Sequence, residues 1–287
     1  MPTHELSPLS DVRLPDVAAY RIVPRRYWGR WLAAAIIVAL VIALLRAFAH
    51  GEIEWAYVGR FLTAPVILKG LVNTVVMAVA AMALGIALGI GAAIMRMSAN
   101  PVLRGVASTY VWLFRGTPLI LQLLLWFNLA LVFPTLGIEG LWHVRTVQVM
   151  TPALAALLGL SINQGAYTSE VVRAGLLSVD PGQVEAAKAI GMTGMRALRR
   201  IIFPQAMRVI IPPLGNEFIG MIKLTSLASV IQFTEILHNA QNIYYANSRV
   251  IELLIVAAIW YIAVITVLTP LQMLLERRFA RGTRGGR

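Results

Sequence analysis

Two clusters of polar residues interrupt apolar stretches of this 287-residue sequence, and their side chains are the ones that could do chemistry. In the first cluster Asn163, Tyr167 and Glu170 recur at positions i, i+4 and i+7, so they share one face of a helix. Polar groups in apolar helices usually face a bundle interior or a water-filled path. A ligand pathway and a set of interhelical hydrogen bonds both fit this pattern. The candidate pathway residues are Asn163, Gln164, Tyr167, Glu170, Asn216, Glu217, Lys223, Thr225 and Ser226.

The charged members of these clusters need partners. Glu170 and Arg173 are three residues apart and can pair, which lowers the cost of each charge in an apolar setting. Glu217 and Lys223 are six apart, too far around a helix to pair, so we expect each to meet another helix or a second subunit. A zwitterionic ligand needs both an acceptor and a donor along its path. Hydrogen bonding at a dimer interface explains the same residues equally well.

The remaining residue types exclude several chemistries. No cysteine is present, which excludes disulfides and thiolate sites, and the four histidines are far apart in sequence. The lysines are Lys69, Lys188 and Lys223, and none follows a glycine, so no Gly-Lys-Ser/Thr phosphate loop exists. No Ser/His or two-aspartate pair is evident in the apolar stretches. We therefore expect no catalytic residue, no metal and no cofactor on this chain, and no enzyme activity.

The elements that must position these residues are membrane helices. The sequence is 59% hydrophobic and 13% charged, with a mean hydropathy of +0.75, whereas soluble chains carry about 25% charged residues. About 20 apolar residues cross a bilayer as a helix, because backbone groups in lipid must be paired internally. The sequence predicts an all-α polytopic membrane protein with six spans, at 31–49, 70–95, 116–138, 146–169, 209–232 and 253–275.

The basic residues predict the orientation of these spans. Loops on one side carry 18 lysines and arginines, and those on the other carry five. The positive-inside rule then places both termini and the loop 177–208 in the cytoplasm. The net charge of +12 is therefore explained by topology and by attraction to lipid headgroups, and we expect no nucleic-acid partner. Ala47-Phe48-Ala49 is similar to a signal-peptidase site, but an uncleaved first span gives the even count that the charges require.

The loop 177–208 contains signals for two short helices. Asp180 and Pro181 suit the cap and first turn of a helix. Gly191 ends or bends that helix, and a second helix is expected from about Thr193 to Ile202, stopped by Pro204. Between these points, Glu185, Ala186 and Ala187 form a small, mostly methyl surface that suits docking into a groove of another protein. An ordinary exposed helical turn is the alternative interpretation.

The spacing of these residues resembles the EAA loop of ABC importer permeases. Glu185-Ala186-Ala187, Gly191 and Ile201-x-Phe203-Pro204 follow the family pattern, except that Phe203 stands where the family has leucine. Other stretches resemble the polar amino-acid branch of these permeases, although Leu224 departs from a usually polar position. These stretches begin at Phe114-Arg115-Gly116-Thr117-Pro118, Tyr167, Pro212-Pro213 and Lys223-Leu224-Thr225-Ser226.

The resemblance covers about residues 66–278 and implies a five-helix permease core of the MetI-like type, preceded by an extra span. It divides the chain into a cytoplasmic basic tail (1–30), the first span (31–49), the core (66–278) with the coupling loop 177–208, and a disordered cytoplasmic tail (279–287). The resemblance also implies which residues couple the chain to an ATPase. They are Glu185, Ala186, Ala187, Gly191, Ile201 and Pro204.

The function implied is import of a polar amino acid across the inner membrane by a multi-pass subunit. The implied partners are a cytoplasmic ABC ATPase carrying ATP and Mg, a second identical or homologous permease subunit, an extracytoplasmic binding protein and membrane lipid. An ion-coupled secondary carrier is the alternative, with Glu170 or Glu217 carrying the coupling proton. A carrier has no need of a glycine-jointed docking loop, which argues against that alternative.

Overall fold

The computed structural model describes residues 28–138 and 142–280 and divides the chain after Ile53 into two compact units. In the first unit the helix α1 (Trp28–His50) is apolar except near its ends, where Arg30, Arg46 and His50 lie, and it has no buried residue. Its 23 residues are enough to cross a bilayer. It includes the predicted first span. The predicted tails lie mostly outside the described residues, at 1–27 and 281–287.

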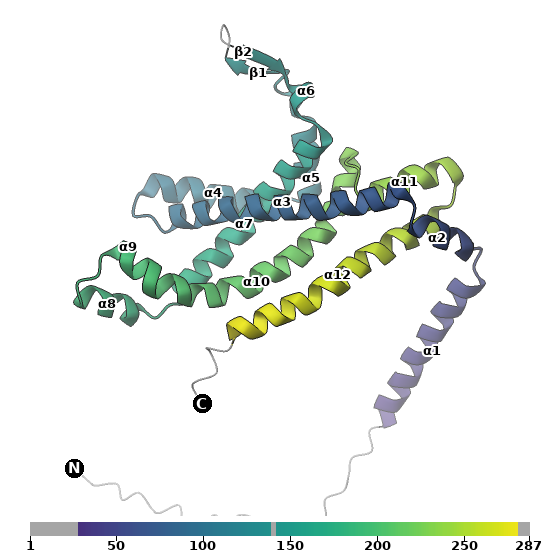
Figure 1. Cartoon of the computed structure of the whole chain (residues 1–287), viewed down its shortest axis with the longest axis horizontal. Helices are drawn as coiled ribbons and strands as arrows, with labels where there is room; N and C mark the ends of the chain where they lie inside the picture. Colours follow the sequence, from purple (N-terminus) through teal and green to yellow (C-terminus); the bar gives the residue numbers. More distant parts are fainter. Residues whose placement is uncertain (1–27, 139–141, 281–287) are drawn as a thin grey trace, which may run out of the picture. The chain divides into compact units, whose positions relative to one another are not determined.

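The second unit is built on four long helices, of which α3, α10 and α12 are seen in front in Figure 1. Helix α3 packs along α7, while α10 packs against both α7 and α12. Small residues make the α3–α7 contact close, since Gly85 and Gly89 of α3 lie against Gln164 and Thr168 of α7. The bounds of the four helices are α3 Pro65–Arg96, α7 Pro152–Leu177, α10 Phe203–Leu224 and α12 Val250–Ala280.

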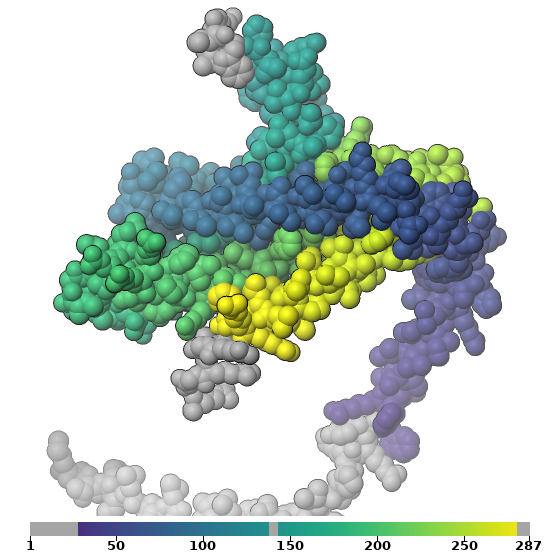
Figure 2. Space-filling model, viewed as in Figure 1, coloured from purple at the N-terminus to yellow at the C-terminus, as the bar shows by residue number. Residues whose placement is uncertain are grey.

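The predicted span 116–138 is wrong as a single helix. Helices α4 (Pro101–Gly116) and α5 (Leu119–Phe127) meet at Thr117-Pro118 with a bend of 104°. Proline has no N–H to continue the helix, and Thr117 is in an extended conformation. After α5 come the 3₁₀ turn η2 (Leu129–Leu131) and the antiparallel strands β1 (Thr135–Ile138) and β2 (Trp142–Arg145). Figure 2 shows this part, with α6 (Thr146–Val149), projecting from the long helices.

The prediction that Pro204 stops the second loop helix is also wrong. Helix α9 (Gly194–Ala197) passes through a π-helical turn (Leu198–Ile202) directly into α10, as one continuous helix from Gly194 to Ile231. In the π turn the N–H of Phe203 donates to the carbonyl of Leu198. Pro204 then occupies the first turn of α10, and the wider π turn leaves room for its ring.

Short elements complete the fold. Helix α2 (Trp55–Leu62) packs on α12, and α8 (Pro181–Ala189) precedes α9 in the loop. After α10 a 3₁₀ helix, η4 (Thr225–Ile231), leads to α11 (Ile236–Asn247). Glu235, fully buried, caps α11 by accepting hydrogen bonds from the N–H groups of Leu237 (2.9 Å) and His238 (2.6 Å) and from the hydroxyl of Tyr261.

The described helices fit a multi-pass membrane protein. Four helical segments are long and apolar enough to cross a bilayer, and there are five if the bent pair α4–α5 is counted as one span. Helix α7 has 26 residues, but its polar residues lower its hydropathy. With α7 included, the described helices give six candidate spans, the number expected from the sequence. The count of six spans stays a prediction. The all-α fold class is confirmed, with one small two-stranded hairpin added.

Candidate functional site: a polar cavity and a helical loop

A cavity of about 500 Å³ lies among α4, α7 and α10 of the second unit. Its size is in the range of small-molecule sites. The bend between α4 and α5 supplies one wall, and α7 and α10 supply the others. The lining residues are Arg115, Gly116, Thr117, Pro118, Leu119, Asn163, Gln164, Tyr167, Glu217, Gly220 and Leu224.

The bend that forms this wall is held by two side-chain amides. Gln122 donates from Nε2 to the carbonyl oxygens of Phe114 (3.0 Å) and Thr117 (3.1 Å) and to the Thr117 hydroxyl (2.8 Å). Asn163 of α7 donates from Nδ2 to the Phe114 carbonyl (2.9 Å) and to Oε1 of Gln122 (3.2 Å). These bonds pair backbone groups that the break in the helix leaves open. Asn163 therefore has a structural task as well as a place in the cavity wall.

Glu217 is fixed on the opposite wall by neutral donors. Its Oε2 accepts from Nε2 of Gln164 (2.7 Å) and from the hydroxyl of Thr168 (3.2 Å). Among the described residues Glu217 has no ion pair, and its Oε1 accepts no hydrogen bond. A half-buried carboxylate with one open oxygen can accept a hydrogen bond from a cationic group of a ligand.

Three arginines converge on Glu170. Arg96 of α3, Arg115 of α4 and Arg173 of α7 lie 2.8, 3.1 and 3.1 Å from its carboxylate oxygens. The pairing of Glu170 with Arg173 was predicted from their spacing, but the other two arginines were not. Arg115 also lies over the ring of Tyr167, 5.2 Å from its centroid, and lines the cavity. The only sequence signal for Arg115 is its position directly before the Gly-Thr-Pro break.

The cavity gathers some of the predicted pathway residues and not others. Asn163, Gln164, Tyr167 and Glu217 line it, and Glu170 contacts it through Arg115. Asn216 instead donates to Glu276 of α12 (3.2 Å), and the hydroxyls of Thr225 and Ser226 donate to carbonyls of their own helix. Lys223 is exposed, and the described part of the chain offers it no acidic partner.

The second feature is the loop 177–208, which contains α8 and α9. Asp180 caps α8 by accepting from the N–H of Gly182 (2.6 Å), and Gly191 takes φ +74°, a conformation that favours glycine. Glu185 and Ala186 are exposed, as docking residues must be. Ala187 is 1% exposed, so its methyl group belongs to the packing of the loop itself.

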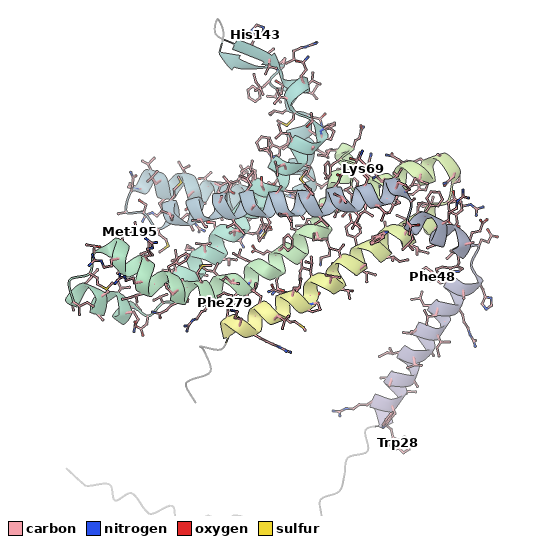
Figure 3. All side chains as sticks on the ribbon, in the orientation of Figure 1. Trp28, Phe48, Lys69, His143, Met195 and Phe279 are labelled. Carbon is pink, nitrogen blue, oxygen red and sulfur yellow. The ribbon has the colours of Figure 1, made fainter. Side chains whose placement is uncertain are left out.

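Two apolar residues of this loop were missed from sequence. Ile190 and Met195 are 76% and 73% exposed, among the most exposed large apolar side chains of the second unit. Figure 3 shows Met195 at the outer end of the loop, on α9. Nothing in the apolar pattern distinguishes these residues, because their exposure depends on the turn at Gly191. Ile201 and Pro204 lie in the π turn and the start of α10.

Comparison with known proteins identifies the class. Residues 85–281 match the model of the family described as binding-protein-dependent transport system inner membrane component. This match covers more than half of the chain, which therefore belongs to that family of ABC importer permeases, in the polar amino-acid branch.

Individual relatives agree with this placement. The chain is 40% identical over 266 residues to the arginine transport system permease protein ArgU of Corynebacterium glutamicum, covering 91% of this chain and 83% of the relative. It is 33% identical to the glutamine transport system permease protein GlnP of Escherichia coli K12, covering 75% and 93%. It is also similar to a crystal structure described as an amino acid ABC transporter with histidines, with a TM-score of 0.67 and 36% identity over 77% of this chain and 98% of the other.

Proposed function

We propose that this chain is the membrane-spanning subunit of an ATP-driven importer that moves a polar amino acid across the inner membrane into the cytoplasm. The observation that carries the proposal is a physical link between the cavity and the loop. Helix α10 lines the cavity with Glu217, Gly220 and Leu224, and it continues without interruption into α9 of the loop. A movement of the loop would therefore act directly on the wall of the cavity.

In this proposal the loop docks on a separate cytoplasmic ATPase, which holds ATP and Mg. Exposed Glu185 and Ala186 allow close approach, and exposed Ile190 and Met195 supply apolar area for the contact. Gly191 gives the turn between α8 and α9. Ala187 contributes by letting α8 pack within the loop, and Ile201 and Pro204 join the loop to α10.

The polar walls of the cavity support a polar amino acid as substrate. Glu217 offers an open carboxylate oxygen, and the similarity to arginine and glutamine permeases supports the same substrate class. A binding protein would deliver the amino acid from the extracytoplasmic side. A second permease subunit would cover the exposed face of α10 that carries Asn216 and Lys223. The charge distribution supports cytoplasmic termini.

Transport by the reconstituted complex tests this function. The chain would be placed in liposomes with its ATPase and binding-protein partners, and uptake of labelled L-arginine, L-histidine and L-glutamine would be measured. We expect uptake of at least one amino acid that requires ATP on the side of the loop. Liposomes with the chain alone should not move any of them. Exchange of substrate by the chain alone, down a gradient, would contradict the proposal and favour the ion-coupled carrier.

A further inference from the structure

The wall of the cavity next to α4 carries more positive charge than its neighbours balance. Glu170 is the shared partner of Arg96, Arg115 and Arg173, and no other acidic side chain in the described ranges pairs with these three. One carboxylate among three guanidinium groups leaves a surplus of two positive charges. Such a surplus favours the binding of an anionic group.

Arg115 is the arginine placed to bind that group. Among the three it alone lines the cavity, and its side chain is 41% exposed against 18% for Arg96. It contacts Glu170 through Nη1 only, at 3.1 Å, and its guanidinium carbon lies over the Tyr167 ring, 5.2 Å from the ring centroid. The remaining N–H groups of Arg115 have no partner among the described residues.

Glu170 can release Arg115 and stay neutralised. Its Oε1 contacts Arg96 at 2.8 Å, and its Oε2 accepts from Nε and Nη2 of Arg173 at 3.2 and 3.1 Å. The carboxylate therefore keeps two guanidinium partners after the third has turned away. Exchange of one carboxylate partner for another leaves Arg115 paired, so the exchange strands no unpaired guanidinium.

We propose that Arg115 binds the α-carboxylate of the transported amino acid in the cavity and leaves Glu170 to Arg96 and Arg173. This assignment rests on the proposed function and names the residue that recognises one end of the substrate. A guanidinium matches a carboxylate with two parallel N–H donors, which a lysine ammonium cannot do. The ring of Tyr167 lies beside this guanidinium, and Glu217 on the α10 wall is left for a cationic group of the ligand.

Equilibrium binding to the permease–ATPase complex, purified without the binding protein, tests the assignment. The probes are three labelled pairs, each an amino acid and its decarboxylated counterpart: L-arginine and agmatine, L-histidine and histamine, L-glutamine and 4-aminobutanamide. We expect the wild-type complex to prefer at least one amino acid over its counterpart by about tenfold, the scale of a charge-assisted hydrogen bond. Arg115→Gln should remove this preference while leaving the affinity for the counterpart unchanged.

Two further variants separate recognition from folding and charge. Arg104→Gln removes an exposed arginine of the same helix and should keep the full preference. Arg115→Lys keeps the charge but not the two-donor geometry, so it should keep only part of the preference for the amino acid over its decarboxylated counterpart. A full preference in Arg115→Gln, or no preference for any amino acid in the wild-type complex, would overturn the assignment. Failure of the ATPase to copurify with the wild-type chain would contradict the proposed function instead.

Discussion

Single methyl groups decide how closely α3 and α7 can approach. A Cβ at Gly89 would lie 2.6 Å from the Cβ of Thr168 and 2.9 Å from the carbonyl oxygen of Gly165. Real Cβ atoms do not tolerate such distances, so the two helices would have to move apart. Thr168 is one of the donors to Glu217, so any such movement reaches the cavity. The glycine at 91, by contrast, has no atom within 4 Å of the position of a Cβ.

Gly89→Ala is therefore expected to destabilise the protein, and Gly91→Ala is its matched control. Overpacking in a tight contact costs about 1–3 kcal/mol, which lowers the melting temperature by roughly 2–4 °C for each kcal/mol. Gly91→Ala should leave the melting temperature unchanged or raise it slightly, because alanine is a better helix former than glycine. Thermal unfolding of the purified chain in detergent measures both. An equal melting temperature for the two variants would contradict the close α3–α7 contact.

Residue roles could be predicted only where a local pattern defines them. The pairing of Glu170 with Arg173 and the cap at Asp180 depend on neighbours within one helical turn, and both are seen. The contact of Asn163 with the Phe114 carbonyl joins positions 49 apart in sequence, and no spacing rule indicates it. Arg96 and Arg115 reach Glu170 from other helices for the same reason.

At the scale of elements, α9 of the loop is continuous with α10. Because of the π turn at Leu198–Ile202, the chain remains helical through Pro204. Helix α9 of the loop and the cavity-lining part of α10 therefore belong to one continuous helix. A proline in a sequence normally indicates the end of a helix, and the π turn that overrides this rule has no sequence signature of its own. The bend at Thr117-Pro118 shows the opposite case, because there the proline does separate two helices, α4 and α5.

We expect Ile190 and Met195 to anchor the loop on the ATPase. Replacing both with serine removes exposed apolar area without touching the buried Ala187. Loss of two anchors should weaken association with the ATPase by at least about tenfold, measured by titration of the ATPase onto the purified chain. Ala187→Trp is a poorer test, since it would disrupt the loop itself.

The control for this prediction is Met97→Ser. Met97 is 47% exposed and caps α3 on the side that the charge pattern assigns to the cytoplasm, but it lies outside the loop. The Met97→Ser variant should bind the ATPase with the same affinity as the wild type. Unchanged association of the Ile190/Met195 double variant would remove these two residues from the docking surface.

At the scale of the whole molecule, the fold class could be predicted from sequence, and the shape of the predicted span 116–138 could not. Length, apolarity and charge asymmetry act over many residues, so they survive local irregularities. The bend between α4 and α5 is held by hydrogen bonds from the Gln122 and Asn163 amides to the Phe114 carbonyl, which periodicity does not report.

Single cysteines in this cysteine-free chain test the topology. Cysteines at Gly51 and His143 should react in intact cells with a thiol reagent that cannot cross the membrane. Cysteines at Ala99 and Thr193 should react only after the cells are opened. The positive-inside rule predicts this division. Reaction of the Thr193→Cys variant from outside would place the loop on the wrong side for any cytoplasmic ATPase.

The most direct test of the central claim asks whether the amino acid passes through the cavity among α4, α7 and α10. Gly220 lines the cavity, and a Cβ there meets no atom within 4 Å, so Gly220→Cys should fold and transport normally. Reaction of this cysteine with a methanethiosulfonate should abolish ATP-dependent uptake in the reconstituted complex, and saturating substrate should slow the reaction. The same treatment of Gly105→Cys, an open position on α4 outside the cavity, should leave uptake unchanged. Complete modification of Gly220→Cys with full uptake would show that the substrate takes another path.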